Sequence, residues 1–191
     1  MERRTLFGKN LRADEAVESP RIVADFVVFG DVYDMGGGAY EQIDPHAFDN
    51  TLSGDIRALI DHETSMVLGR TKAGTLRLYV DEYALRGEID INPDDRQAMD
   101  LYARVKRGDV SQCSFGFEII REEREEIPEG VMWTIREVKL WEVSIVTFPA
   151  YEATSAVART SADGSKAFAD WKNRMKERIS NAQTFGNTGE A

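Results

Sequence analysis

Short runs of β-branched and aromatic residues, separated by glycine-containing turns, constrain the fold of this chain more than any other feature. Val, Ile, Phe and Tyr favour extended backbone, and Gly favours turns. The runs therefore predict strands throughout the central part of the chain. We therefore expect a mainly β fold with flanking helices (α+β), closed or nearly closed into an antiparallel β-barrel. The predicted strands lie within residues 21–34, 55–62, 67–71, 74–91, 109–123 and 131–151.

Three stretches are typical of helices instead. Residues 93–108 begin with Pro and acidic residues, and Ala98, Leu101 and Val105 then recur at helical spacing before a terminating glycine. The dipeptide Asp44-Pro45 supplies an N-cap carboxylate and a proline suited to the first helical position. The other two predicted helices cover about 46–52 and about 166–180.

The length of 191 residues suits one domain with modest tails. We expect a flexible, poorly ordered N-terminal arm over 1–20, a folded domain over 21–154, and a linker, terminal helix and tail over 155–191. No stretch approaches the roughly 18 apolar residues of a membrane span, and no apolar run follows the basic N-terminus as in a signal peptide. The net charge of −10 argues against coating nucleic acid, and one cysteine excludes an internal disulfide framework.

Histidine is scarce, which limits the number of residues that could act as a general base. The chain has only His46 and His62. His46 falls in the first turn of a predicted short helix, and we give it a structural role. His62 ends an apolar strand, which by itself is also more typical of a structural histidine than of a catalytic one.

A candidate nucleophile lies on a later strand. Alternation over 113–119 places Cys113, Phe115 and Phe117 on one face and Ser114 on the other, beside a glycine that leaves room for another chain. With the apolar face in the core, Ser114 points outward. A serine hydroxyl needs a base to take its proton, and His62 is the only credible base. A plain polar residue on a solvated strand is the simpler interpretation of Ser114.

A third segment offers a carboxylate. Alternation predicts that Trp141, Val143 and Ile145 share one face, while Glu142 and Ser144 share the other. A carboxylate among apolar residues needs a partner. The ring N–H of His62 is one suitable partner, which would fix the tautomer and stabilise the imidazolium; an arginine on a neighbouring strand is the other.

Other chemistries have weaker support. Cys113 falls on the apolar face, where a neutral thiol is favoured, and Ser111 shares that face. Ser144 remains open as a nucleophile. Two histidines and one cysteine do not make a common zinc site without several carboxylates, and the glycines at 36–38 lack the Lys-Ser/Thr of a phosphate loop. We therefore expect no metal and no other cofactor.

Taken together, these segments resemble the prohead protease family of tailed bacteriophages, which is distantly similar in fold to herpesvirus assemblin. The resemblance covers roughly residues 21–159, and four blocks in the same order are far more specific than one motif. The blocks are RIVADFVVFGDVYD with EQIDPHAFDNTL, DIRALIDHETSMVLGRTKAGTLRL, VKRGDVSQCSFGFEI and WEVSIVTFPAYEATSAVAR.

The resemblance implies a serine endopeptidase with Ser114 as nucleophile, His62 as base and Glu142 as third member. The herpesvirus relatives use a second histidine as third member, and this chain has none after His62. Position 46 departs from the family, which usually has a small residue there. Arg70 is a further hypothesis, as a donor that helps position a water or the oxyanion.

The resemblance also implies substrates, a location and an oligomeric state. The expected substrates are the major capsid protein and scaffold segments, cleaved inside the assembling procapsid in the host cytoplasm, with possible processing of the chain itself in the small-residue linker after residue 152. We expect a homo-oligomer, with no nucleic-acid or membrane partner. Two rival interpretations remain: an inactive scaffold or assembly protein with the same fold, and a cytoplasmic peptidase unrelated to capsids.

Overall fold

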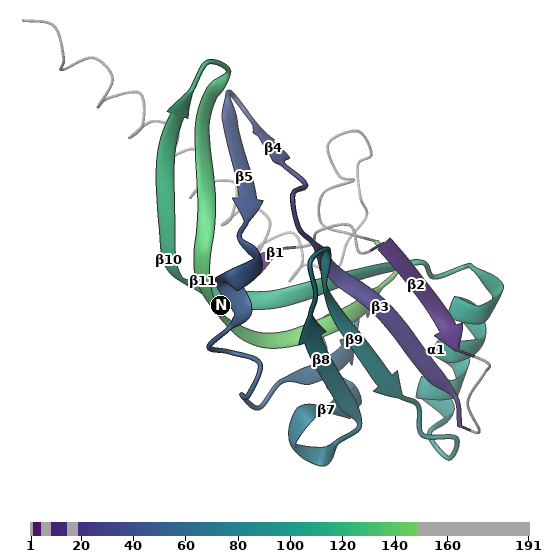
Figure 1. Ribbon diagram of the computed structural model, residues 1–191. Coiled ribbons are helices and arrows are strands. Elements are labelled where there is room, and N and C mark those ends of the chain that lie inside the picture. Colours follow the sequence, from purple (N-terminus) through teal and green to yellow (C-terminus); the bar gives the residue numbers. More distant parts are fainter. Residues whose placement is uncertain (1, 5–8, 15–18, 149–191) are drawn as a thin grey trace, which may run out of the picture.

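The computed structural model describes residues 2–4, 9–14 and 19–148, and it is mainly β, as the sequence predicts (Figure 1). The predicted terminal helix and linker lie outside the described residues. In chain order the elements are β1 (Glu2–Arg4), β2 (Lys9–Asp14), β3 (Arg21–Val28), β4 (Tyr33–Gly36), β5 (Ala39–Ile43), the 3₁₀ turn η1 (Pro45–Phe48), β6 (Arg57–Ile60), β7 (Glu63–Arg70), η2 (Thr71–Ala73), β8 (Leu76–Val80), β9 (Ala84–Asp90), α1 (Arg96–Arg107), β10 (Gln112–Ile127) and β11 (Gly130–Val146).

The strands form two sheets. One has the order β1-β10-β11-β5-β4, with β6 pairing a second segment of β11 and β7 pairing β6; the other has the order β2-β3-β9-β8. Among the described residues both sheets have free edges, so the pairing forms no closed ring. The long antiparallel hairpin of β10 and β11 curves through the whole molecule, with β4 and β5 along one end and the four-stranded sheet beside the other (Figure 1).

The expected N-terminal arm contributes two strands. β1 pairs with β10, and β2 pairs with β3, both antiparallel. Each extends a sheet by supplying hydrogen-bond partners to backbone groups that would otherwise line an edge. The mixed charge of this segment gives no indication of strands. The reason is that an edge strand can form by backbone pairing without a continuous apolar pattern.

The core lies between the sheets. β10 contributes Cys113, Phe115 and Phe117 to it, which confirms the predicted apolar face. The Phe115 and Phe117 rings stack with centroids 4.7 Å apart, and Phe48 meets Phe115 edge-on. The Cys113 thiol also contacts the backbone oxygen of Asp25 on β3, at 3.3 Å. The contact between Cys113 and Asp25 joins the long hairpin to the four-stranded sheet.

Helix α1 (Arg96–Arg107) lies within the predicted stretch 93–108, begins three residues later than that stretch and ends directly before Gly108. The Asp95 side chain accepts hydrogen bonds from two backbone N–H groups of the first turn, and Gly108 ends the helix in the left-handed conformation. Its buried residues Ala98, Leu101 and Val105 are the apolar positions noted in the sequence. Among the described residues no helix has the length and apolar character to cross a membrane.

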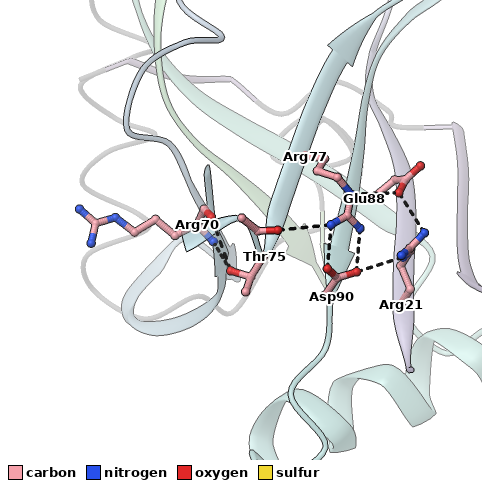
Figure 2. A network of polar contacts seen from close by, with 7 residues as sticks. Arg21, Arg70, Thr75, Arg77, Glu88 and Asp90 are labelled. Carbon is pink, nitrogen blue, oxygen red and sulfur yellow. Dashed lines mark hydrogen bonds and ion pairs between the residues drawn. The ribbon is translucent and has the colours of Figure 1, made fainter. Parts of the chain in front are cut away.

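The four-stranded sheet carries an ion-pair network that crosses three strands (Figure 2). Asp90 on β9 accepts from Arg77 on β8 at 2.7 Å and from Arg21 on β3 at 3.0 Å. Glu88, two residues earlier on β9, contacts the same two arginines. Two cations and two anions therefore alternate across the sheet, with part of each side chain in water.

Candidate active site

An extra residue in β11 sets the geometry of the candidate site. In the β10–β11 register, Gly116 lies opposite Glu142, but the next residue, Phe117, lies opposite Leu140. Trp141 is left without a counterpart, so it forms a β-bulge. A bulge of this kind shifts the in–out alternation of its strand by one residue and increases the local twist.

The bulge changes which residues of β11 enter the core. Before it, Leu140 is buried in the core; after it, Val143 is. Trp141 itself is 37% exposed, so the prediction that it shares a face with Val143 is wrong. The consequence is that Glu142 and Ser144 leave the hydrophobic core and turn to the opposite side of the sheet. We call this side of β6, β10 and β11 the site face.

His62 reaches the site face from a two-residue turn, not from a strand as the sequence predicts. Ile60 pairs with Glu63, and between them Asp61 and His62 both have positive φ, 48° and 61°. Hairpin turns with two positive φ values match the twist of the strands, but they favour Asn, Asp and Gly. A histidine in this conformation is uncommon and indicates a position held by its surroundings.

A hydrogen-bonded chain joins three side chains on the site face. His62 Nδ1 lies 2.7 Å from Glu142 Oε1, and Ser144 Oγ donates to Glu142 Oε2 at 2.6 Å. The side chains of His62 and Glu142 are 15% and 4% exposed. Of the two partners considered for Glu142, the structure therefore shows the histidine. Arg57, its neighbour on β6, directs its guanidinium to Asp55 instead.

Ser114 lies on the same site face. It is directly opposite Ser144 in the β10–β11 register, and Ser144 in turn is beside Leu59 on β6, two residues before the turn that carries His62. Cα atoms of directly opposed antiparallel residues lie about 4.5–5.5 Å apart. Ser114 and Glu142 thus lie on the adjacent strands β10 and β11, and His62 lies in the turn that follows β6, the next strand.

The prediction that Ser114 is exposed is wrong for this structure, because its exposed fraction is 0%. Alternation correctly indicates that Ser114 is not on the apolar core face. It cannot indicate whether a second layer covers the other face of the strand. Ser144 is equally buried.

The other residues considered from the sequence, Cys113, Arg70 and His46, lie outside this hydrogen-bonded chain. Burial, with a smaller contribution from the charge of Asp25, raises the pKa of the Cys113 thiol well above its usual range, which disfavours the thiolate. The Arg70 guanidinium holds both carboxylate oxygens of Asp55, at 2.7 and 2.6 Å. His46 is exposed and contacts Asp49.

Two contacts near His62 were not anticipated from sequence. The Asp61 carboxylate accepts from the backbone N–H of Thr147 at 2.8 Å, and its other oxygen lies 3.3 Å from the Thr147 hydroxyl. Asp is a turn-forming residue, and its position directly before His62 at the end of an apolar run was the available signal. Thr147 offers no such signal, because its partner is 86 residues away.

Comparison with known proteins identifies the family of this chain. The family model described as Caudovirus prohead serine protease matches residues 9–167. The prohead protease of Enterobacteria phage HK97 is 29% identical over 139 residues, which is 71% of this chain and 60% of that protein. The chain therefore spans less than two thirds of this relative, and no solved structure matches it. Because the family match covers most of the chain and includes all three candidate residues, this chain belongs to the Caudovirus prohead serine protease family.

Proposed function

We propose that this chain is a serine endopeptidase of procapsid maturation, with Ser114 as nucleophile, His62 as general base and Glu142 as the residue that orients His62. The observation that carries the proposal is the 2.7 Å contact between His62 Nδ1 and a buried Glu142 carboxylate on the site face that also carries Ser114. Desolvation of a carboxylate is costly unless hydrogen bonds offset it, and here His62 and Ser144 both contact the Glu142 carboxylate. Family membership supports the same assignment.

The proposed chemistry is acyl transfer. Glu142 occupies Nδ1 of His62, so Nε2 is the ring nitrogen left to take the Ser114 proton. Ser114 Oγ attacks the scissile carbonyl carbon, and the imidazolium then gives its proton to the leaving amine as the peptide C–N bond breaks. Water, activated by the same nitrogen, hydrolyses the acyl-enzyme. The Glu142 carboxylate stabilises the imidazolium in both steps.

Burial of Ser114 adds a requirement to this mechanism. A substrate carbonyl must come within bonding distance of an oxygen whose residue has no exposed surface in this structure. The covering groups must therefore move when substrate binds. Catalytic contacts in ligand-free proteins commonly tighten in the substrate complex.

The substrates that fit the family are the major capsid protein and scaffold segments, cleaved within the assembling procapsid by a homo-oligomer of this chain. Processing of the chain itself in the linker after residue 152 belongs to the same proposal. The barrel architecture of the herpesvirus proteases is the fold we propose for the complete protein. The packing of β10 against β3, through Cys113 and Asp25, supports two sheets that wrap around one core.

A second candidate function is a non-catalytic assembly protein with the same fold. The complete burial of Ser114 is the observation in its favour. A serine-directed fluorophosphonate separates the two functions, because only a serine activated by a base reacts rapidly. Labelling of the wild-type chain that disappears in Ser114→Ala rejects the non-catalytic function.

Co-expression with the capsid precursor tests the proposal directly. Ser114→Ala should abolish processing, with a loss of roughly 10⁴-fold or more in rate. Ser111→Ala is the matched control, because it removes an exposed serine three residues away and should leave processing unchanged. Ser144→Ala should slow processing without abolishing it. Normal processing by Ser114→Ala would reject Ser114 as the nucleophile, and a complete loss in Ser144→Ala alone would assign that role to Ser144.

A further inference from the structure

Asp61 attaches the turn that carries His62 to the end of β11 and to Thr147, the residue that follows this strand. Asp61 uses its backbone N–H to bond Ile145 O at 2.9 Å, and its carboxylate accepts from the Thr147 backbone N–H at 2.8 Å. Parallel pairing of β6 with β11 runs from Arg57 to Ile60 and ends just before the turn. The Asp61 contacts therefore continue the attachment beyond the last paired residue.

This attachment holds the turn in a strained backbone conformation. Asp61 and His62 both have positive φ, a conformation that is strained for most residues other than glycine. Asp tolerates this conformation better than most residues, and His is also enriched there. Without a tether, the turn would be free to adopt other conformations, and these would move the imidazole away from Glu142.

We propose that Asp61 is a positioning residue that acts through His62. By tying the turn to β11, it fixes the imidazole against Glu142, which lies on that same strand. The inference rests on the proposed catalytic role of His62 and extends it. Asp61 does not touch the reacting atoms, so its loss should lower kcat while KM stays unchanged.

Three variants separate the tether from the backbone strain. Asp61→Ala removes the tether and keeps a Cβ, and we expect kcat to fall by on the order of 10- to 100-fold, as for a misplaced catalytic group. Asp61→Gly also removes the tether but relieves the positive φ. We expect a similar loss of kcat. Asp61→Asn retains an oxygen that can accept from Thr147 and tolerates positive φ, so it should keep kcat close to wild type.

Asp81→Ala is the matched control. Asp81 makes the same kind of contact in the β8–β9 turn, where its carboxylate accepts from the backbone N–H groups of Tyr83 and Ala84. This turn belongs to the other sheet, and we expect Asp81→Ala to change stability but not kcat. A loss of kcat in this control equal to that in Asp61→Ala would mean that any loosened hairpin has the same effect, and it would overturn the proposal.

Ring-nitrogen NMR of His62 supplies a readout that general destabilisation does not move. With only two histidines in the chain, His46→Asn leaves the His62 signals as the only ones. Glu142 holds the proton on Nδ1, so neutral His62 should be the Nδ1–H tautomer in the wild-type background. Asp61→Ala should shift His62 toward a mixture with the Nε2–H tautomer, whereas Asp61→Asn should keep the Nδ1–H tautomer of the wild type.

The outcomes distinguish this inference from the function on which it rests. Wild-type kcat in Asp61→Gly would show that Asp61 only accommodates the backbone conformation, and it would overturn the tether. An unchanged tautomer together with unchanged kcat in Asp61→Ala would do the same. Unaltered processing by Ser114→Ala would instead reject the proposed function, whatever the Asp61 variants show.

Discussion

Two polar clusters in this protein differ in nearly every physical respect. The network of Arg21, Arg77, Glu88 and Asp90 lies on the four-stranded sheet with side chains 26–40% exposed (Figure 2). The site chain of His62, Glu142 and Ser144 is nearly excluded from water. The first balances two cations against two anions, whereas the second places one carboxylate between two polar hydrogens.

The difference indicates what each cluster contributes. Half-exposed ion pairs exchange their partners for water with little change in free energy, so they add modestly to stability. A buried carboxylate has no such alternative, and its desolvation is offset only by the groups that contact it. Loss of a partner should therefore be tolerated in the network and should be severe at the site.

The largest expected effect is on catalysis at the site. Glu142→Gln keeps an oxygen for His62 and gains an amide that can donate to Ser144, so the fold should persist. Without the negative charge the imidazolium is no longer stabilised, and kcat should fall by roughly 10³- to 10⁴-fold. Single-turnover cleavage of a capsid-derived peptide measures this. A decrease smaller than about 10-fold would mean that the carboxylate of Glu142 is structural.

A change of register after the bulge should have the next largest effect. Insertion of one alanine between Trp141 and Glu142 moves Val143 to the site face and Glu142 toward the core, where an unpaired charge costs about 3–5 kcal/mol. Trp141→Ala keeps the number of residues and should retain both fold and activity. Urea unfolding of the two variants measures the contrast. Equal stability of both would show that β11 accommodates an extra residue without a change of faces.

Loss of one member of the network should have a small effect. Arg77→Ala should lower the free energy of unfolding by about 0.5–1 kcal/mol, and less at high salt, because its partners remain half-exposed and retain Arg21. Activity should not change. Urea unfolding at two salt concentrations provides the measurement; a loss of stability as large as that of the alanine insertion after Trp141 would contradict the distinction between the two clusters.

The smallest expected effect concerns acid stability. Arg70 binds the Asp55 carboxylate and lowers its pKa to about 2, below its ordinary value of 3.8. A depressed carboxyl pKa contributes stability above the unfolded value, and this contribution is lost as pH falls from about 4 to about 2. Asp55→Asn should therefore show a shallower loss of stability across that range than wild type. Denaturant titrations at several pH values test it, and identical slopes would argue against the shift.

Much of the fold could be predicted from local sequence. The apolar positions and terminating glycine of α1 and the apolar face of β10 each depend on residues close together in the chain. The scarcity of histidine also limited any base to two residues. For these features local propensity and tertiary packing agree, which is why the pattern alone was informative.

Other features could not be predicted because they depend on partners distant in sequence. The bulge at Trp141 exists only relative to β10, and alternation within β11 alone assigned that residue to the wrong face. The strands β1 and β2 depend on pairing with β10 and β3, which are distant in sequence, and β2 also packs Leu11 and Ala13 against the core.

The sequence by itself determined which side chains could perform the chemistry, since Ser114, His62 and Glu142 follow from residue type, alternation and family resemblance. Only the tertiary structure decided how they are held: the positive-φ turn at His62, its tether through Asp61, and the buried contact with Glu142. The physical reason is that residue type sets what an atom can donate or accept, whereas position on a shared face depends on register between strands, which forms only when the whole chain folds.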